Sequence, residues 1–368
     1  MNVVVTGGGT AGHVFPALAT ATALRDLHGA SVVFIGAEDG QEAHLVPDAG
    51  FRFVPVHVAA AQARLSRSTV RAVALAIRGS SSCRSLVAGA DVVLSIGGFA
   101  CGPAALAARR TRTPLVLIEP NSVPGVVNRI AARWAAAVAT TFEGTAARLP
   151  SVRVDRTGNP IRREIATVRS HRDRLRTEAC EAFGLERDRT TVFVFGGSQG
   201  AVHLDRVVAD ALPALASRED LQLLVSAGPG NDGDLARAVD RGAALRVAVM
   251  PFIDRMDRAY ALADIVVARA GASVAEIAAC GLPSILVPYP HATENHQEAN
   301  ARELVSADAA RMVLDHALSS STLVPAILDL VEDDATRDEL GRAARAWARP
   351  DAAERIAALC VEIAEART

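Results

Sequence analysis

Short, continuously apolar runs alternate with longer alanine-rich segments of helical periodicity along most of the chain. In each run the hydrophobic residues stand at consecutive positions rather than at every second one, which is typical of strands buried on both faces. Such strands form parallel sheets covered by helices, so the pattern predicts an α/β protein. The runs are VVVTGG (3–8), SVVFIG (31–36), DVVLSIGG (91–98), PLVLIE (114–119), TVFVFGG (191–197), LQLLVSAG (221–228), LRVAVMPF (245–252), DIVVARAG (264–271) and PSILVPY (283–289).

The two halves of the chain resemble each other. VVVTGGGTAGH in the first half corresponds to TVFVFGGSQGA in the second, and DVVLSIGGFACGP corresponds to DIVVARAGASVAE. Two Rossmann-like domains in tandem are the simplest explanation of this duplication. The junction is predicted at TGNPIRRE (157–164), where Gly158 and Pro160 interrupt both periods. Beyond it we expect charged helical sequence to Glu186, and a tail of two helices broken at Pro350.

Length and composition narrow the class of protein. A chain of 368 residues is long enough for two domains. All 39 basic residues are arginine, so there is no lysine for a Walker A loop or a Schiff base, which excludes most P-loop NTPases and pyridoxal enzymes. The formal net charge of −2 favours neither nucleic acid nor anionic lipid as a partner.

The distribution of cysteines and apolar residues indicates a compartment. The five cysteines are widely spaced and form no zinc or redox motif, which is typical of a reduced, cytosolic environment. The first strand is expected to begin at Asn2, which leaves no room for a charged leader. The chain has no run of about 18 apolar residues free of charge, so we expect no membrane-spanning helix.

The glycine loops are the first candidates for a binding site. Ligands of open α/β sheets bind beyond the carboxyl ends of the strands, so two such domains facing each other predict a cleft lined by these loops. In FGGSQGA a strand ends at Phe195 and a helix is expected near Ser198, where free backbone N–H groups favour an anion such as phosphate. A merely tight strand-to-helix turn would give the same pattern, but the corresponding glycines after Thr6 strengthen the phosphate interpretation.

Four side chains stand where a substrate can be held. Glu276 is expected about one turn into a helix after Gly271, where its carboxylate can accept hydrogen bonds from a ribose diol or simply complement the helix dipole. Arg162 and Arg163 at the junction can meet a pyrophosphate bidentately or form a solvated basic turn. His13, at a predicted helix start, can act as a general base or as a structural histidine.

A metal site is not predicted. Asp232-Gly233-Asp234 has the DxD pattern that holds a metal ion in some enzymes of nucleotide-sugars. It stands just before a predicted helix, however, and aspartate is a common N-cap residue. The cap interpretation is therefore favoured.

Six motifs together closely resemble the MurG family of glycosyltransferases, in the family's order and over nearly the whole chain. They are GGGTAGHVFPALA, SIGGFACGP, TGNPIRRE, GGSQGA, FIDRMDRAYALADIVVARAGASVAEI and HATENHQEANA. Members transfer N-acetylglucosamine (GlcNAc) from UDP-GlcNAc to undecaprenyl-pyrophosphoryl-MurNAc-pentapeptide (lipid I), which gives lipid II for bacterial peptidoglycan. The resemblance implies the GT-B fold, in which two Rossmann-like domains with parallel sheets face each other across a cleft, with no metal or cofactor.

The resemblance also implies that the two domains bind different substrates. Residues 1–160 would bind the acceptor and associate with the membrane, and a C-terminal helix at 351–368 would pack back onto this domain. Residues 161–350 would bind UDP-GlcNAc. The protein would be peripheral, at the cytoplasmic face of the cell membrane, with UDP-GlcNAc and lipid I but no nucleic acid as partners.

Individual roles follow from the same resemblance. The loop from Gly7 to His13 would face the acceptor pyrophosphate and the donor sugar, with His13 as base or acceptor ligand and Glu119 as the next candidate base. The residues implied in binding UDP-GlcNAc are Thr10, Ala11 and Gly12 of the first loop, Asn128 for the sugar on a helix from Asn121 onward, Arg162 and Ser198 for the phosphates, Ile253 for uracil, Glu276 for the ribose and Gln297 for a sugar hydroxyl.

The chain departs from the family pattern at two places. Ala11 stands where many members have glycine, and a methyl group is tolerated there if φ stays negative. LIEPNSVPG (117–125) replaces a commoner His-Glu-Gln-Asn stretch, which keeps Glu119 and Asn121 but removes any role of the lost side chains.

Three other functions compete with this one. Another GT-B enzyme could act on a different lipid or a natural product. An NAD(P)-dependent oxidoreductase would share the strand followed by glycines, but the acidic residue expected about 20 residues after that fingerprint is not clearly placed, since Glu38 and Asp39 come late. A non-catalytic sugar-nucleotide sensor is disfavoured by the presence of His13, Glu276 and Gln297.

RLSRSTVRAVALAIRG (64–79) predicts an amphipathic helix for the membrane surface. Such a helix can lie on an anionic leaflet, pack its apolar side on the sheet, or do both. One side of its helical wheel carries arginines and the adjacent side carries apolar residues: Arg64, Arg67, Arg71 and Arg78, and then Val70, Val73, Ala74 and Ile77.

Overall fold

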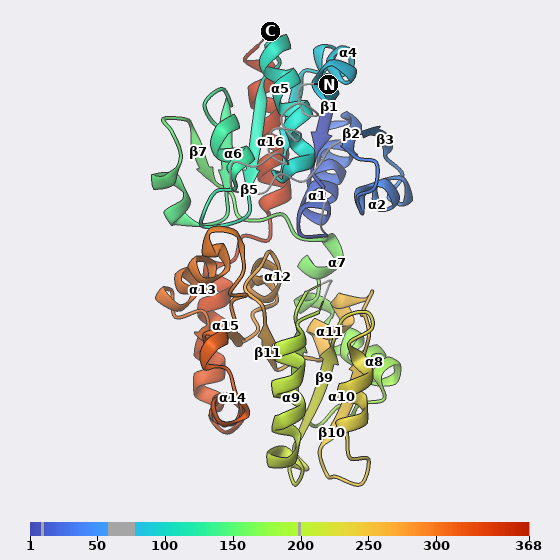
Figure 1. Cartoon of the computed structure of the whole chain (residues 1–368), viewed down its shortest axis with the longest axis vertical. Coiled ribbons are helices and arrows are strands. Elements are labelled where there is room, and N and C mark those ends of the chain that lie inside the picture. Colours follow the sequence, from blue (N-terminus) through green and yellow to red (C-terminus); the bar gives the residue numbers. More distant parts are fainter. Residues whose placement is uncertain (9–10, 58–77, 198–199, 368) are drawn as a thin grey trace. The chain divides into compact units, whose positions relative to one another are not determined.

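The protein consists of two compact units (Figure 1). The computed structural model describes residues 1–8, 11–57, 78–197 and 200–367. Unit 1 comprises Met1–Arg162 and Arg349–Thr368, and unit 2 comprises Arg163–Ala348. The chain therefore passes from unit 1 to unit 2 within the GNPIRRE segment and returns shortly before its last helix.

Unit 1 is built on a seven-stranded sheet in which every strand pair is parallel. The strand order is β3-β2-β1-β4-β5-β6-β7, which is the order of a Rossmann sheet extended by one strand. The strands are β1 (Asn2–Thr6), β2 (Ser31–Ala37), β3 (Arg52–Val56), β4 (Val92–Ser95), β5 (Leu115–Glu119), β6 (Ala137–Thr140) and β7 (Val154–Arg156).

Helices cover both faces of this sheet, as the consecutive apolar residues predict. Along β1, Val3 and Val5 belong to one buried cluster, whereas Val4 belongs to the cluster on the opposite face. The helices of unit 1 are α1 (Ala11–His28), α2 (Glu42–Asp48), α4 (Arg84–Ala88), α5 (Gly102–Thr111), α6 (Val126–Ala131) and α16 (Ala352–Glu365), with 3₁₀ turns η1 (Phe99–Cys101) and η2 (Glu143–Arg148).

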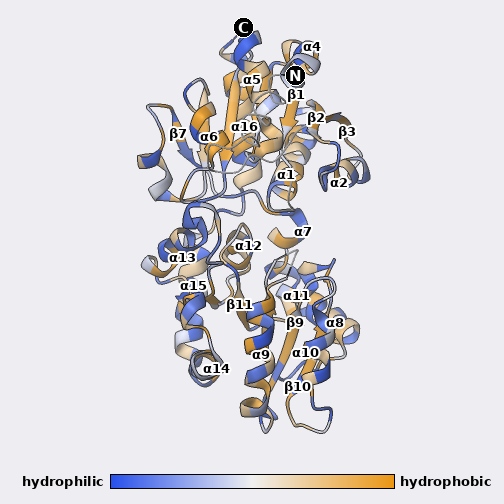
Figure 2. Ribbon diagram, viewed as in Figure 1, coloured by the Kyte–Doolittle hydropathy of each residue, from blue (hydrophilic) through white to orange (hydrophobic). Residues whose placement is uncertain are grey.

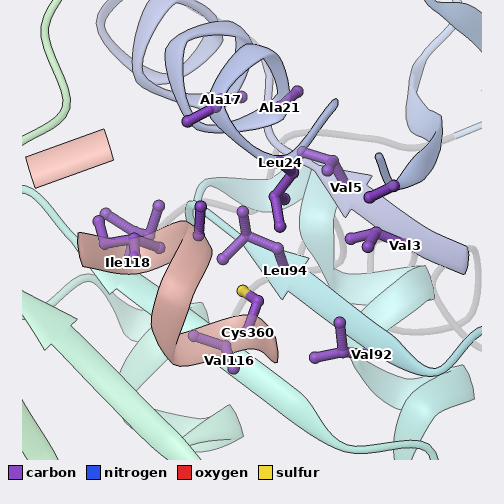
Figure 3. Packing of buried hydrophobic residues seen from close by; sticks show 14 of the residues in the cluster. Val3, Val5, Ala17, Ala21, Leu24, Val92, Leu94, Val116, Ile118 and Cys360 are labelled. Carbon is purple, nitrogen blue, oxygen red and sulfur yellow. The ribbon is translucent and has the colours of Figure 1, made fainter. Parts of the chain in front are cut away.

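The last helix of the chain is part of the unit 1 core. Figure 3 shows Cys360 of α16 beside Val116 and Leu94 of the sheet, and Ala17 and Ala21 of α1 belong to the same cluster. Arg153 near β7 holds the exposed side of α16 through an ion pair with Glu362. Helix α16 thus completes a sheet whose strands lie far earlier in the sequence.

Unit 2 repeats the architecture with a six-stranded parallel sheet of order β10-β9-β8-β11-β12-β13. Counted from its own first strand, this is the same order as in unit 1, which explains the sequence duplication. The strands are β8 (Thr190–Phe195), β9 (Leu221–Ser226), β10 (Arg246–Met250), β11 (Ile265–Ala268), β12 (Ser284–Leu286) and β13 (Arg311–Met312).

The helices of unit 2 are amphipathic. Figure 2 shows strands β5 and β9 as hydrophobic, whereas α9 carries both hydrophobic and hydrophilic residues. The buried positions of α9 include Leu204, Val207, Val208 and Ala211, the spacing of one helical face. The helices are α7 (Arg163–Ala166), α8 (Arg172–Phe183), α9 (Val202–Leu215), α10 (Asp232–Ala238), α11 (Met256–Leu262), α12 (Ser273–Cys280), α13 (His296–Ser306), α14 (Ser320–Glu332) and α15 (Asp334–Trp347), with 3₁₀ turns η3 (Arg169–His171), η4 (Thr293–Asn295) and η5 (Asp315–Ala317).

The predicted α/β class with two parallel sheets is confirmed, but three predicted helix starts are wrong. Helix α9 begins at Val202 rather than near Ser198, because Gly200 has a positive φ of 74° that a helix does not permit. Helix α6 begins at Val126 rather than Asn121, since Pro124 disfavours helical geometry in the residue before it. Helix α10 begins at Asp232 itself, so this aspartate is not the N-cap that the sequence suggested.

Within the described ranges, no helix is both long enough and apolar enough to cross a membrane. Of the predicted amphipathic helix at 64–79, only Arg78 and Gly79 are described; its other residues lie outside the described ranges.

Candidate active site

The first glycine loop and the SIGG loop of unit 1 meet at His13. Strands β1 and β4 are neighbours in the sheet, so the loops that follow them leave the same edge. His13 lies in the first turn of α1. A Cβ atom placed on Gly98, which follows β4, would lie 3.9 Å from both Cε1 and Nδ1 of His13. The imidazole ring therefore lies close to Gly98 at the carboxyl edge of the sheet, where ligands of such sheets bind.

Glu119 ends β5 and organises the loop that follows it. Its side chain is buried, and Oε1 accepts the backbone N–H of Asn121 at 3.0 Å. Oε2 accepts the backbone N–H of Gly125 at 3.0 Å and the Asn128 amide at 2.9 Å. Burial raises the pKa of Glu119 to about 7, even though these donors favour the charged form. Both oxygens of this predicted candidate base are thus engaged with the chain itself.

Asn128 is placed at the centre of the same edge. Besides Glu119, its Nδ2 donates to the backbone oxygen of Ile118 at 2.9 Å, which fixes the amide orientation. Its Oδ1 is buried and has no hydrogen-bond partner among the described residues. Gly97 has a φ of 87°, and a Cβ atom there would stand 2.9 Å from Asn128 Nδ2. Glycine is therefore required at 97 by both the backbone and the amide beside it.

Arg162 of the GNPIR motif contacts the start of α1. Its guanidinium carbon lies 4.7 Å from the ring centroid of Phe15, two residues beyond His13. A cation over an aromatic face at this distance is attracted to the ring. This contact brings the last residue of the unit's first segment next to its first helix, so two motifs far apart in the sequence share one region.

Glu276 of unit 2 lies in the first turn of α12, as predicted, and is held by an aromatic residue that the sequence did not single out. The hydroxyl of Tyr260 donates to Glu276 Oε2 at 3.1 Å. The Tyr260 ring is fully buried against Phe193 and Phe195 of β8, with centroids 6.0 and 6.1 Å away. Glu276 is half-buried, and the buried Tyr260 ring fixes the hydroxyl that binds its Oε2.

Gln297 of α13 lies at the other side of the loop before α12. Its Oε1 accepts the backbone N–H of Tyr289 at 3.0 Å, which leaves the amide nitrogen oriented toward Gly271. A Cβ atom on Gly271 would lie 3.7 Å from that nitrogen. Glu276 and Gln297 therefore flank the segment after β11, while Ile253, also predicted, is a buried residue after β10.

Sequence reasoning missed an ion-pair network in unit 2, formed by Arg269, Asp315 and His203. Arg269, directly after β11, is buried and donates to the backbone oxygens of Val287 and Pro288, both at 3.2 Å, and to Asp315. Asp315 also pairs with His203 of α9 at 3.0 Å. The only sign of this network in the sequence was an arginine within the largely apolar run DIVVARAG.

Asp205 is a second residue that the sequence did not indicate. It lies in the first turn of α9, is buried, and neither carboxyl oxygen has a hydrogen-bond partner among the described residues. Burial raises the pKa of Asp205 to about 7, against the opposing attraction of Arg269.

Some predicted site residues lie outside the described ranges. Thr10 and Ser198 belong to this group, and nothing is described of the side chain of Ala11. Gly12 lies in the first turn of α1 beside His13. Among the residues that are described, no three His, Cys, Asp or Glu side chains are arranged to hold a metal ion.

Comparison with known proteins gives the same family for both units. Residues 3–140 match the glycosyltransferase family 28 N-terminal domain, and residues 191–356 match the family 28 C-terminal domain. The chain is 35% identical to a UDP-N-acetylglucosamine--N-acetylmuramyl-(pentapeptide) pyrophosphoryl-undecaprenol N-acetylglucosamine transferase of Desulforamulus reducens, over 98% of each chain. It is 33% identical to the Bacillus subtilis protein of the same name, over 99% of each chain.

Solved structures agree with these relatives. The crystal structure of Acinetobacter baumannii MurG superimposes with a TM-score of 0.78 at 27% identity, covering 98% of this chain and 99% of that one. A UDP-GlcNAc 2-epimerase from Neisseria meningitidis bound to UDP-GlcNAc has a TM-score of 0.69 at 13% identity, covering 98% of this chain and 100% of that one, a likeness of fold alone.

Proposed function

The chain belongs to glycosyltransferase family 28, among the MurG transferases, and on this basis we propose that it transfers GlcNAc from UDP-GlcNAc to the 4-hydroxyl of MurNAc in lipid I. The observation that carries the proposal is the match of both family 28 domains along one chain whose relatives share this name over nearly their full length. The product is lipid II, and the second product is UDP.

The reaction is an inverting displacement. The 4-hydroxyl oxygen of MurNAc attacks the anomeric carbon of GlcNAc, and the bond from that carbon to the β-phosphate oxygen breaks. The hydroxyl proton passes to a base, and the electron pair of the broken bond leaves with UDP. Stabilisation of the negative charge that develops on the phosphate is the largest electrostatic requirement of this step.

Unit 2 holds the donor nucleotide. The half-buried carboxylate of Glu276 accepts hydrogen bonds from the two ribose hydroxyls, and Tyr260 keeps it oriented toward them. The backbone near Ile253 receives the uracil, and the amide of Gln297 receives a sugar hydroxyl. These loops are supported by the network of Arg269, Asp315 and His203, because its hydrogen bonds join the ends of β11 and β12 to α9.

Charge on the departing UDP is met by Arg162 and by backbone N–H groups of the GGSQGA loop, including Ser198. Arginine suits this role because its planar guanidinium can bind two phosphate oxygens at once. The contact with Phe15 holds Arg162 near the start of α1. Thr10, Ala11 and Gly12 complete the contacts to the donor sugar.

His13 takes the proton. Its place against Gly98, at the carboxyl edge of the unit 1 sheet, is where the acceptor of such a sheet binds. Glu119 is the less suitable base, since both its oxygens accept hydrogen bonds from residues 121–128. Its role is to position Asn128, which binds the sugar through the otherwise unpartnered Oδ1.

The acceptor is a membrane lipid, so the protein works as a peripheral protein at the cytoplasmic face of the membrane. The predicted helix at 64–79, with its arginines on one side, supplies the electrostatic part of this contact. Among the described residues, Val126 and Ile130 are 41% and 49% exposed. Both lie in α6, the helix that follows β5, and their spacing of four residues places them on the same helix face. Together with the arginines they favour unit 1 as the lipid-facing part.

One experiment separates the competing functions. Purified protein is titrated with UDP-GlcNAc and, separately, with NADH, and is then given a lipid I analogue together with UDP-GlcNAc. The proposal requires binding of UDP-GlcNAc but not NADH, followed by turnover. Binding without turnover would indicate a sensor, and binding of NADH would indicate an oxidoreductase.

A further inference from the structure

Three glycines from separate segments surround one buried carboxylate in unit 1. Glu42 is the first residue of α2, and its side chain is fully buried. Gly8 follows β1, Gly36 lies in β2, and Gly40 lies in the turn before α2. A Cβ atom on Gly8 or Gly40 would overlap the Glu42 carboxylate, and one on Gly36 would stand 2.6 Å from Glu42 Cγ. The carboxylate thus fills the space that three absent side chains leave.

Space rather than backbone conformation requires glycine at these positions. Gly8, Gly36 and Gly40 are not among the glycines with positive φ, so their backbones are open to any residue. What an alanine would meet is the carboxylate itself. A Cβ atom on Gly7 would likewise meet a neighbour, at 3.2 Å from Ile96 inside the core. The first glycines of the loop therefore serve internal packing.

Glu42 connects the end of β2 to the end of β1. Its Oε1 accepts the backbone N–H of Ala37, the last residue of β2, at 2.8 Å. On its far side Gly8 approaches Gly98 so closely that a Cβ on Gly98 would lie 3.1 Å from the Gly8 oxygen. Gly98 in turn lies beside the ring of His13. Glu42, Gly8, Gly98 and His13 thus lie close to one another in this order.

We propose that Glu42 is a positioning residue for the acceptor half of the reaction. The buried carboxylate sets the backbone at Gly8 and, through Gly98, the place of His13 against the sheet edge. The kinetic part of this proposal rests on the proposed transferase function, whereas the local contacts of Glu42 can be tested without it.

The kinetic test uses Glu42→Ala and Glu42→Gln, with Glu38→Ala as the matched control. Glu38 lies in the turn before α2 and is also a glutamate, but it is exposed and pairs only with His57, at 2.6 Å, among the described residues. A small misplacement of catalytic groups costs about 10- to 100-fold in rate. We expect Glu42→Ala to lose about that much in kcat/KM for a lipid I analogue, with KM for UDP-GlcNAc nearly unchanged, and Glu42→Gln to recover part of the loss. Wild-type acceptor kinetics in Glu42→Ala, or equal losses for donor and acceptor, would overturn the proposal.

A double-variant cycle tests the overlap directly. Gly40→Ala places a methyl group into the carboxylate, so it should damage acceptor turnover in the otherwise unchanged chain. In the Gly40→Ala, Glu42→Ala double variant the overlapping group is gone, and the combined loss should be smaller than the product of the two single losses. A combined loss equal to that product means that Gly40 and Glu42 act independently, which contradicts the proposed arrangement.

Hydrogen exchange of the substrate-free protein supplies the readout that needs no activity. In Glu42→Ala and Glu42→Gln, amides of residues 3–17 should exchange faster than in wild type, while peptides of unit 2 keep their protection. Unchanged exchange at 3–17 rejects Glu42 as the residue that holds this loop. A wild-type protein that transfers no sugar rejects the transferase proposal instead, and the exchange result still decides the role of Glu42.

Discussion

The hydroxyl of Tyr260 donates a hydrogen bond to Glu276 Oε2 at 3.1 Å, and it does so from a ring that is itself fully buried. Tyr260→Phe removes this donor and keeps the ring packing on Phe193 and Phe195. Because water can replace the lost bond at a half-buried carboxylate, we expect KM for UDP-GlcNAc to rise about fivefold, equivalent to about 1 kcal/mol. Tyr289→Phe changes the chain's other tyrosine and serves as the control in the same steady-state assay.

Glu276→Ala should raise KM for UDP-GlcNAc more than Tyr260→Phe does. It removes two charge-assisted hydrogen bonds to the ribose, which together contribute roughly 2–4 kcal/mol. KM for UDP-GlcNAc should therefore rise strongly, with a smaller loss in kcat, since the ribose is remote from the reacting bond. Glu181→Ala, an exposed glutamate of α8 in the same unit, should leave both constants unchanged. An unchanged donor KM in Glu276→Ala would remove this residue from the site.

The assignment of His13 as base predicts a loss in the chemical step. His13→Ala should lower kcat by roughly 10²–10⁴-fold, the usual contribution of a positioned general base. Binding of UDP, measured by calorimetry, should persist. His28→Ala, at the exposed end of the same helix, is the matched control. A near-normal kcat in His13→Ala would transfer the role to another group and reopen the case for Glu119.

The raised pKa of Asp205 predicts an unusual dependence of the protein's stability on pH. Burial raises its pKa to about 7 in the folded protein, from the ordinary aspartate value of 3.8. Between these two values the folded state holds a proton that the unfolded state has released, so this residue's contribution to stability is full below about pH 4 and declines as the pH rises to about 7. Above that range the charged, buried carboxylate destabilises the fold.

Asp205→Asn should remove this dependence. At pH 8 the variant should be more stable than wild type by an amount on the order of a few kcal/mol, because a tenfold change in the proton-binding constant corresponds to about 1.4 kcal/mol. Chemical denaturation at pH 5 and pH 8 measures the difference, with Asp210→Asn on the exposed side of α9 as control. Equal stability of Asp205→Asn and wild type at both pH values would show that Asp205 does not titrate as described.

The membrane contact predicts binding that depends on charge. The wild-type protein should sediment with anionic vesicles at low salt and be released at high salt, since each arginine near the surface contributes about 1 kcal/mol. Arg67→Glu plus Arg71→Glu should weaken sedimentation. Arg206→Glu plus Arg241→Glu makes the same change in net charge at exposed positions of unit 2 and should not. Equal binding of all three proteins at low salt would exclude the 64–79 segment as the contact.

The sheets were the most predictable part of the protein. Continuous apolar runs such as VVVTGG and TVFVFGG indicate burial on two faces, as in a parallel sheet between helices. Glu276 could be placed in a first helical turn because Gly271 and the apolar period that follows it fix where α12 begins. Helix starts after glycine turns were less predictable: Gly200, with its positive φ, delays α9 to Val202.

Contacts between distant segments could not be read from the chain. Tyr260 lies in α11, and its partner Glu276 comes from the next helix along. Arg269 and Asp315 are 46 residues apart, and only the folded sheet brings them together. The Glu42 side chain is enclosed by Gly8, Gly36 and Gly40, of which Gly8 lies 34 residues earlier in the chain. Tyr260 and Arg269 thus found their partners through tertiary structure, which a local pattern does not encode.

The most direct test of the central claim is the transfer itself. Purified protein is incubated with UDP-GlcNAc and a lipid I analogue, with and without EDTA, and the product is analysed by NMR while released UDP is counted. We expect a β-1,4-linked GlcNAc–MurNAc product, one UDP released per disaccharide formed, and a rate unaffected by EDTA. Hydrolysis of UDP-GlcNAc without a disaccharide, or a product with retained anomeric configuration, would contradict this claim.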